Sequence, residues 1–149
     1  MIAVAIVTRK LRRGKTYEDF RKAWFHTEGF GTPATLHTMI NVDDPRTITV
    51  IGFIETSESN LERLLEIDIA QRLDSTLDDI IEPGQIERQF GLMRAQDDFS
   101  APGALDYAAA RVAGRPVDQA AFDQRLERVR QALVTASEKR DRLRAARGE

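Results

Sequence analysis

Two histidines, His26 and His37, are the side chains of this sequence best suited to general acid–base chemistry near neutral pH. His37 lies in a segment that alternates between apolar and polar residues, which predicts a strand, and Asn41 follows on the same face. Four residues of strand span roughly 13 Å. If that face lines a pocket, the pair could bind opposite ends of a planar ligand, with His37 as the base. The alternative is the polar outer face of an edge strand.

His26, the second catalytic candidate, lies near the end of the first predicted helix. A histidine in the last helical turn also interacts favourably with the helix dipole, which is a purely structural alternative. Either histidine could bind haem iron, but neither lies in a recognisable haem motif. Haem binding is therefore the weakest of these hypotheses, and we expect no cofactor.

Aromatic, thioether and basic side chains supply candidate ligand contacts. Trp24 and Phe53 could form walls around a flat ligand, and Met39 could adapt to its shape. Core packing explains the two aromatic residues equally well. Arg9 belongs to a dense basic cluster that ends at Arg13 and that we place in a loop, where it could attract a carboxylate or phenolate to the mouth of a pocket. A solvated loop is the alternative.

Several well-known chemistries have no motif here. The sequence contains no Walker loop, dinucleotide-binding glycine pattern, HExxH motif or GxSxG motif. Without cysteine there are no disulfides, thiolate zinc sites or cysteine nucleophiles, which suits a reducing cytoplasm. No convincing metal site is present, since the Asp78–Asp79 and Asp97–Asp98 pairs are adjacent in sequence. A net charge of -2 argues against a nucleic-acid binder.

Length and charge divide the chain into two parts. A chain of 149 residues is the usual size of one domain with an appendage. Residues 1–98 carry 12 Lys+Arg against 17 Asp+Glu, whereas residues 99–149 carry 10 against 7. We therefore expect a body over residues 1–97 and an extension over 98–149 that can lie against it by charge attraction. The longest apolar run, residues 2–7, is too short to span a membrane, and no basic segment of a signal peptide precedes it.

Hydrophobic periodicity predicts an α+β body. β-Branched runs and alternating patterns predict strands over residues 2–8, 34–42, 47–55 and 85–96. Helices are predicted from Tyr17, after a capping box at Thr16 and Asp19, and from Leu61, after a capping box at Ser59 and Glu62. The order is strand, helix, strand, strand, helix, strand. This is the ferredoxin-like βαββαβ plan, a four-stranded antiparallel sheet with both helices on one face.

The first and third strands carry apolar residues on both faces. An antiparallel sheet that faces water on one side should instead alternate between apolar and polar residues. Two helices cover only one face, so we expect the other to pack against the same sheet of a second copy.

The C-terminal extension begins as an Ala-, Pro- and Gly-containing linker over residues 98–121, for which we expect no stable element. Asp118 could cap a final amphipathic helix, and residues from Arg140 to Arg147 are expected to form a frayed, solvated end. Heptad spacing in that helix is interrupted at Arg140 and predicts a contact with another subunit or with the body. Its apolar positions are Phe122, Leu126, Val129, Leu133, Ala136 and Leu143.

The stretch RGKTYEDFRKAWFH over residues 13–26, together with the βαββαβ order and the two apolar sheet faces, resembles the dimeric α+β barrel superfamily, nearest to its EthD-like and antibiotic-biosynthesis-monooxygenase-like members. The resemblance implies a homodimer whose two sheets form one barrel around a small apolar or aromatic ligand. The most specific function that the resemblance implies is that of a cofactor-independent monooxygenase, in which the deprotonated substrate reacts with oxygen. The alternative is a non-catalytic ligand-binding or assembly protein that interacts through its C-terminal helix.

Overall fold

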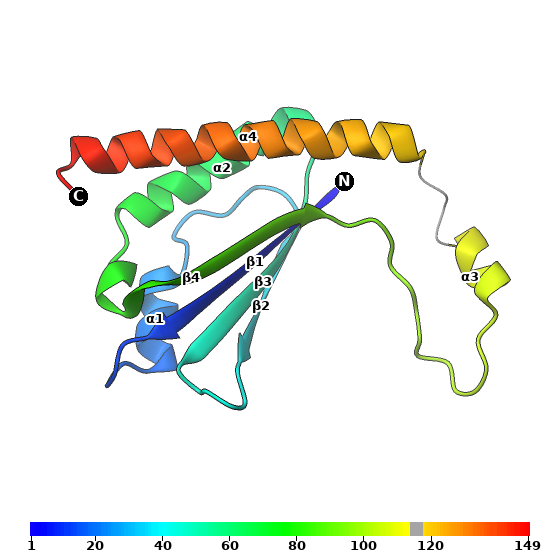
Figure 1. Cartoon of the computed structure of the whole chain (residues 1–149), viewed down its shortest axis with the longest axis horizontal. Helices are drawn as coiled ribbons and strands as arrows, with labels where there is room; N and C mark the ends of the chain where they lie inside the picture. Colours follow the sequence, from blue (N-terminus) through cyan, green and yellow to red (C-terminus); the bar gives the residue numbers. More distant parts are fainter. Residues whose placement is uncertain (114–117) are drawn as a thin grey trace.

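The computed structural model describes residues 1–113 and 118–149, with the backbone alone for residues 111–113. The predicted order of strand, helix, strand, strand, helix, strand is confirmed, and a short 3-10 turn, η1, precedes the last strand. A long C-terminal helix follows (Figure 1). The elements are β1 (Ile2–Leu11), α1 (Tyr17–Trp24), β2 (Ala34–Ile40), β3 (Thr47–Glu55), α2 (Glu58–Leu73), η1 (Leu77–Asp79), β4 (Ile81–Leu92), α3 (Tyr107–Ala113) and α4 (Gln119–Ala146).

The four strands form one antiparallel sheet in the order β2-β3-β1-β4. Strand β1 continues to Leu11, three residues beyond its predicted end, because its partners on both sides extend as far: Arg9 lies opposite Ile48 of β3 and Ile86 of β4. Placing Arg9 in a loop was therefore wrong. The predicted fourth strand, at 85–96, was displaced toward the C-terminus, since β4 begins at Ile81 beside Leu11.

The two predicted capping boxes had different outcomes. The Thr16 hydroxyl accepts a hydrogen bond from the Asp19 backbone N–H, and the Asp19 carboxylate accepts one from the Thr16 N–H, so the box at α1 is confirmed. The box at Ser59 was wrong, because α2 begins earlier, at Glu58, with Ser57 as its N-cap. Helix α1 ends at Trp24, which leaves His26 outside the helix and not in its last turn.

The sheet packs its core against α1 and η1. Phe20 of α1 and Ile48 of β3 are its most deeply buried large side chains. Phe20 also stacks on Trp24, with ring centroids 5.9 Å apart. The full core cluster consists of Leu11, Phe20, Ile48, Val50, Leu77, Ile80 and Ile81.

Helix α4 packs on α2 of its own chain, and the two helices run parallel. Carboxylates along α2 pair with cations along α4 in the same order as in the sequence. The pairs are Glu58 with Arg125 and Arg128, Glu66 with Lys139, and, just after the ends of the two helices, Asp74 with Arg147. The expected attraction between the basic extension and the acidic body is confirmed. Asp118 caps α4 through the Ala121 N–H, as predicted.

The segment between β4 and α4 departs from the predicted featureless linker. Residues 93–106 lead away from the sheet to helix α3, which lies beyond the edge of the body (Figure 1). Phe99 and Tyr107 of this segment are exposed, Tyr107 by 80%. Positions 114–117 of the predicted linker lie outside the described residues.

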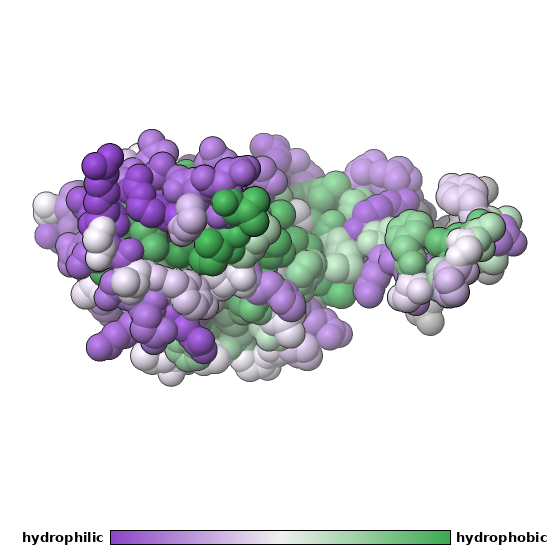
Figure 2. All heavy atoms as spheres, turned by 90° about the horizontal axis from the view of Figure 1, so that it is seen from below, coloured by the Kyte–Doolittle hydropathy of each residue, from purple (hydrophilic) through white to green (hydrophobic). Residues whose placement is uncertain are grey.

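The second face of the sheet is not covered by α1, α2 or α4, which all lie on the other side (Figure 1). By strand register this open face carries Ile6 of β1, Ile51 and Phe53 of β3, and Gln89 of β4. Exposed hydrophobic residues also occur along β2 and the turn after it, among them Met39 and Val42. Seen from below, hydrophobic residues gather on the body with hydrophilic ones around them (Figure 2). The open face is thus apolar at its centre and polar toward β4.

Candidate functional site

A cavity of about 310 Å³ lies between the helix-covered face of the sheet and helices α2 and α4. Its floor is made of small residues at the centre of the sheet: Ala3 and Ala5 of β1 and Gly52 of β3, with Ala5 directly opposite Gly52. Side chains this small leave the space between sheet and helices unfilled. A Cβ added at Gly52 would meet the Leu36 side chain at 3.5 Å. The cavity volume is at the lower end of the range for small-molecule sites.

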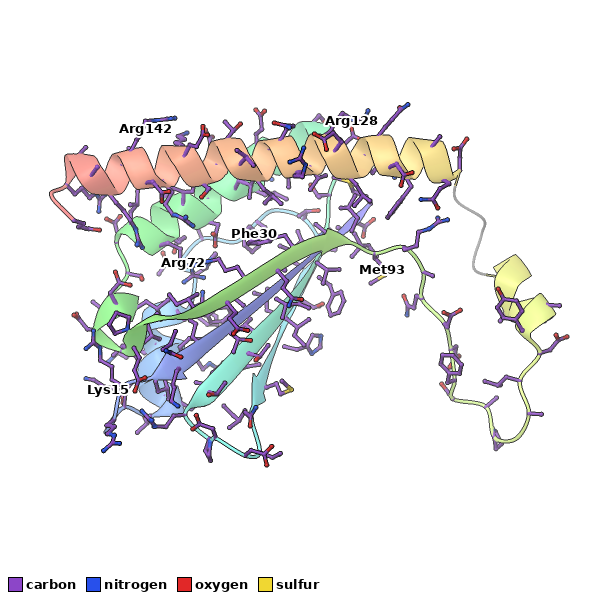
Figure 3. The ribbon with its side chains drawn as sticks, in the orientation of Figure 1. Lys15, Phe30, Arg72, Met93, Arg128 and Arg142 are labelled. Atoms are coloured by element: carbon purple, nitrogen blue, oxygen red, sulfur yellow. The ribbon has the colours of Figure 1, made fainter. Side chains whose placement is uncertain are left out.

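The cavity is apolar at one end and charged at the other. Along each element around it, the lining residues change from apolar to charged toward the same end. Along β1 the lining passes from Ala3 and Ala5 to Arg9. Along α2 it passes from apolar residues (Leu61, Leu64, Leu65) to charged ones (Asp68, Arg72), and along α4 from apolar residues (Val129, Leu133, Ala136) to polar and charged ones (Ser137, Arg140, Arg144). Figure 3 shows Phe30 and Arg72 in the space between the helices and the sheet.

Arg9 is the most deeply buried charge of this lining, with only 5% of its surface exposed. Its Nε and NH1 atoms are buried without a hydrogen-bond partner among the described residues. The guanidinium lies 5.9 Å from the centre of the Phe20 ring, a cation–π contact. Burial, together with repulsion from Arg72 and Arg88, lowers the pKa of Arg9 to about 10. A buried arginine without an anion on its guanidinium is unusual, because desolvation of a charge is costly.

Arg72 connects the charged end to the loop after α1. Its NH1 donates to the Trp24 carbonyl at 2.9 Å, and its NH2 lies 2.7 Å from Nε2 of His26. A guanidinium has no lone pair, so Nε2 accepts this bond and the ring proton of neutral His26 resides on Nδ1. That Nδ1 is buried and has no partner within the described part of the chain.

Asp68 is the carboxylate closest to this group. Its Oδ1 lies 3.5 Å from His26 Nε2 and 3.6 Å from Arg72 Nε. Burial favours its neutral form, but the nearby His26 ring and the charge of Arg72 outweigh burial and hold the pKa of Asp68 below its usual value. Asp68 is therefore an anion that already lies beside Arg72.

Three more arginines complete the charged end: Arg88 from β4 and Arg140 and Arg144 from α4. Burial and the positive charges of Arg140 and Arg144 lower the pKa of Arg88. Among the residues that the structure describes, the lining thus contains five arginines but only two aspartates, Asp68 and Asp78. The resulting field favours negative charge in the cavity.

The structure separates the residues that the sequence suggested for a site. Arg9, Trp24 and His26 line the cavity together. His37, Met39 and Phe53 belong by register to the open face, where the His37 and Phe53 rings meet edge to face at 6.0 Å. Asn41 follows the end of β2, and its Oδ1 accepts hydrogen bonds from the backbone N–H groups of Asp43 and Asp44, which closes the turn to β3.

Sequence reasoning missed Asp68, Arg72, Arg88 and Arg140. Two of them left a signal. Arg140 interrupts the apolar heptad positions of α4, and Arg88 alternates with Ile86 and Phe90 on one face of β4. A charge at a position that the periodicity assigns to an apolar face indicates either a partner or a cavity. The expectation of a frayed end from Arg140 to Arg147 was wrong, since α4 extends to Ala146 and two of these arginines line the cavity.

No family model, curated protein or solved structure matches this chain. Within the described residues, no group of three or more histidines and carboxylates is placed to hold a metal ion. Helices long and apolar enough to cross a bilayer are likewise absent from that part of the chain.

Proposed function

We propose that this protein binds a small organic ligand in the cavity between the helix-covered face of its sheet and helices α2 and α4. The observation that carries the proposal is the floor of small residues, Ala3, Ala5 and Gly52, beneath a roof of two packed helices. Concave sites with apolar walls and a few convergent polar groups are the usual form of small-molecule sites. Trp24 and Phe30 add aromatic surface to the walls.

A larger side chain at the floor of the cavity tests this proposal. Trp24 is the single tryptophan and lines the cavity, so its fluorescence can report occupancy by octanoate, octanol or octylamine. Ala5→Leu adds bulk to the floor, and we expect it to weaken each probe that binds by about tenfold, a change of ~1.4 kcal/mol. The matched control is Ile6→Leu, on the opposite face of the same strand, which should leave affinity unchanged. Binding of none of the probes, or equal binding to Ala5→Leu, would contradict the proposal.

The open sheet face supports a second candidate, the homodimeric barrel implied by the sequence. Ile6, Ile51 and Phe53 form an apolar centre that the described helices leave uncovered. A second copy would bury it, and His37 would then face the barrel interior as the base of a cofactor-independent oxygenation of a phenolic substrate.

Light scattering tests the dimer directly. We expect Ile51→Glu to convert a dimer to monomers, whereas Glu87→Gln, toward the polar edge of the same face, should leave the mass unchanged. Oxygen uptake with an anthrone-type phenol, lost in His37→Ala, tests the chemistry. A monomeric wild-type protein, or uptake no faster than in buffer, would contradict this candidate.

A further inference from the structure

We propose that the ligand of the cavity is an organic acid in its anionic form, with the acidic group at Arg9, Arg72 and Arg88 and the apolar body over Ala5 and Gly52. This inference rests on the proposed ligand-binding function and names the chemical class of its ligand. It differs from the expectation of a basic loop at a pocket mouth, because the arginine concerned is an interior residue of the sheet.

Arg9 is a buried charge with donors that are unpaired within the described part of the chain. Its side chain is buried on the helix-covered face, and its backbone is held by strands on both sides, so the strand cannot shift to carry Arg9 toward solvent without disturbing the sheet. The Phe20 ring compensates for part of its charge, but Nε and NH1 have no acceptor among the described residues. Buried polar groups without partners are rare, and an acid bound in the cavity would supply acceptors to them.

The charged end of the cavity has fewer carboxylates than arginines among the described residues. Oδ1 of Asp68 already lies 3.6 Å from Arg72 Nε and 3.5 Å from His26 Nε2. Asp78 is an exposed residue of η1 whose carbonyl accepts from Arg12. Arg9, Arg72 and Arg88 repel one another, which is one reason that the pKa of Arg9 is lowered. A bound anion would relieve this repulsion, whereas a cation would add to it.

The cavity has an apolar end and a cationic end. Val7 lies opposite Arg88 and Ala5 opposite Phe90, so the change from apolar to cationic lining occurs within a few residues along two paired strands. From Ala5 to Arg9 the strand rises roughly 13 Å. A ligand placed along this axis has its acidic group among arginines and its hydrocarbon among apolar side chains. Inorganic anions would leave the apolar end empty.

Calorimetric titration of the full chain with octanoate and octanol tests the inference, because the two probes differ in the acidic group alone. We expect octanoate to bind at least about tenfold more tightly than octanol at low salt, a difference of ~1.4 kcal/mol. Arg9→Gln should remove that preference by weakening octanoate at least about tenfold more than it weakens octanol. Arg13→Gln, in the exposed loop after β1, is the matched control and should retain the preference. Circular dichroism of each variant verifies that it is folded.

The outcomes separate the two proposals. Octanoate binding that depends on Arg9 supports both. Equal affinity for octanoate and octanol, or an octanoate preference that survives Arg9→Gln, overturns the acid inference but leaves the cavity as a ligand site. Binding of neither probe overturns both.

Discussion

Two groups of arginines in this protein differ in how their charge is balanced. On the outer side, Arg125 and Arg128 of α4 share the carboxylate of Glu58, with contacts of 3.2 and 2.6 Å. Inside the cavity, Arg9 has no carboxylate of the described residues on its guanidinium, although it is far more buried. The chain thus supplies a carboxylate where arginines of α4 fix that helix to α2. It supplies fewer carboxylates than arginines where arginines face the cavity. The difference indicates that the cavity arginines serve a group that the chain itself does not provide.

The largest effect should come from removing the unbalanced charge. We expect Arg9→Met to raise the free energy of unfolding of the ligand-free protein by about 1–4 kcal/mol, because methionine occupies similar space without the desolvation cost of a buried cation. Chemical denaturation measures this change. The same variant should lose its preference for octanoate.

Arg13→Met is the control for this prediction, since an exposed loop substitution changes stability by less than about 0.5 kcal/mol. If Arg9→Met were clearly less stable than the wild type, Arg9 would be a structural charge. The contrast between the two arginine groups would then disappear.

A smaller effect should follow from supplying the missing acid within the chain. Ser137 lines the cavity and its hydroxyl accepts a hydrogen bond from Arg140 NH2 at 3.1 Å. We expect Ser137→Asp to compete with an acidic ligand, weakening octanoate by about tenfold while raising the melting temperature of the empty protein.

Ser137→Asn introduces a side chain of the same shape as aspartate but without its charge. It should change the octanoate affinity and the melting temperature little. An unchanged octanoate affinity in Ser137→Asp would show that the α4 end of the cavity does not take part in binding. The site would then be confined to the strands and α2.

The smallest effect is expected outside the cavity. Hydrogen bonds from Arg128 hold the pKa of Glu58 below its ordinary value of 4.5. The stabilisation is therefore complete above pH 4.5 and is lost as the pH falls through the lowered pKa, because the protonated carboxyl no longer pairs with the two arginines. Glu58→Gln should lower the melting temperature slightly at pH 7 and low salt, and should match the wild type at pH 2 or in 1 M salt.

Glu138→Gln, a change in an exposed glutamate of helix α4, is the control and should leave the melting temperature unchanged. A large decrease in melting temperature at pH 7 in Glu58→Gln would mean that the ion pairs of Glu58 with Arg125 and Arg128 hold α4 in place. The outer arginines would then carry more of the stability than exposed ion pairs usually do.

Most of the fold could be predicted from the sequence because its signals are local. β-Branched runs, alternating patterns and the capping box at Thr16 depend on residues close in the chain. The element order and the helical C-terminus follow from them. The errors are helix α3, which was missed in the predicted linker, and the ends of several elements. Arg9 lies in a strand because β3 and β4 extend alongside it, and strand pairing outweighs the preference of a basic run for solvent.

The candidate site was predictable only in fragments. Arg9, Trp24 and His26 could be singled out by residue type, but their meeting in one cavity depends on how α1, β1 and α2 pack. Arg72 resembles an ordinary charge in an amphipathic helix until its contacts with Trp24 and His26 are seen. His37 stood out equally in the sequence, yet it belongs by register to the other face of the sheet.

The sequence by itself determined the α+β order, the capped helices and an extension of opposite charge that pairs with the body. These depend on local periodicity and on composition. Only the tertiary structure decided that three small residues on adjacent strands leave a cavity, and that arginines from β1, α2, β4 and α4 converge at one end of it. The reason is physical: a cavity and an unbalanced charge are properties of side chains that are distant in sequence, and they exist only after strands and helices have packed together.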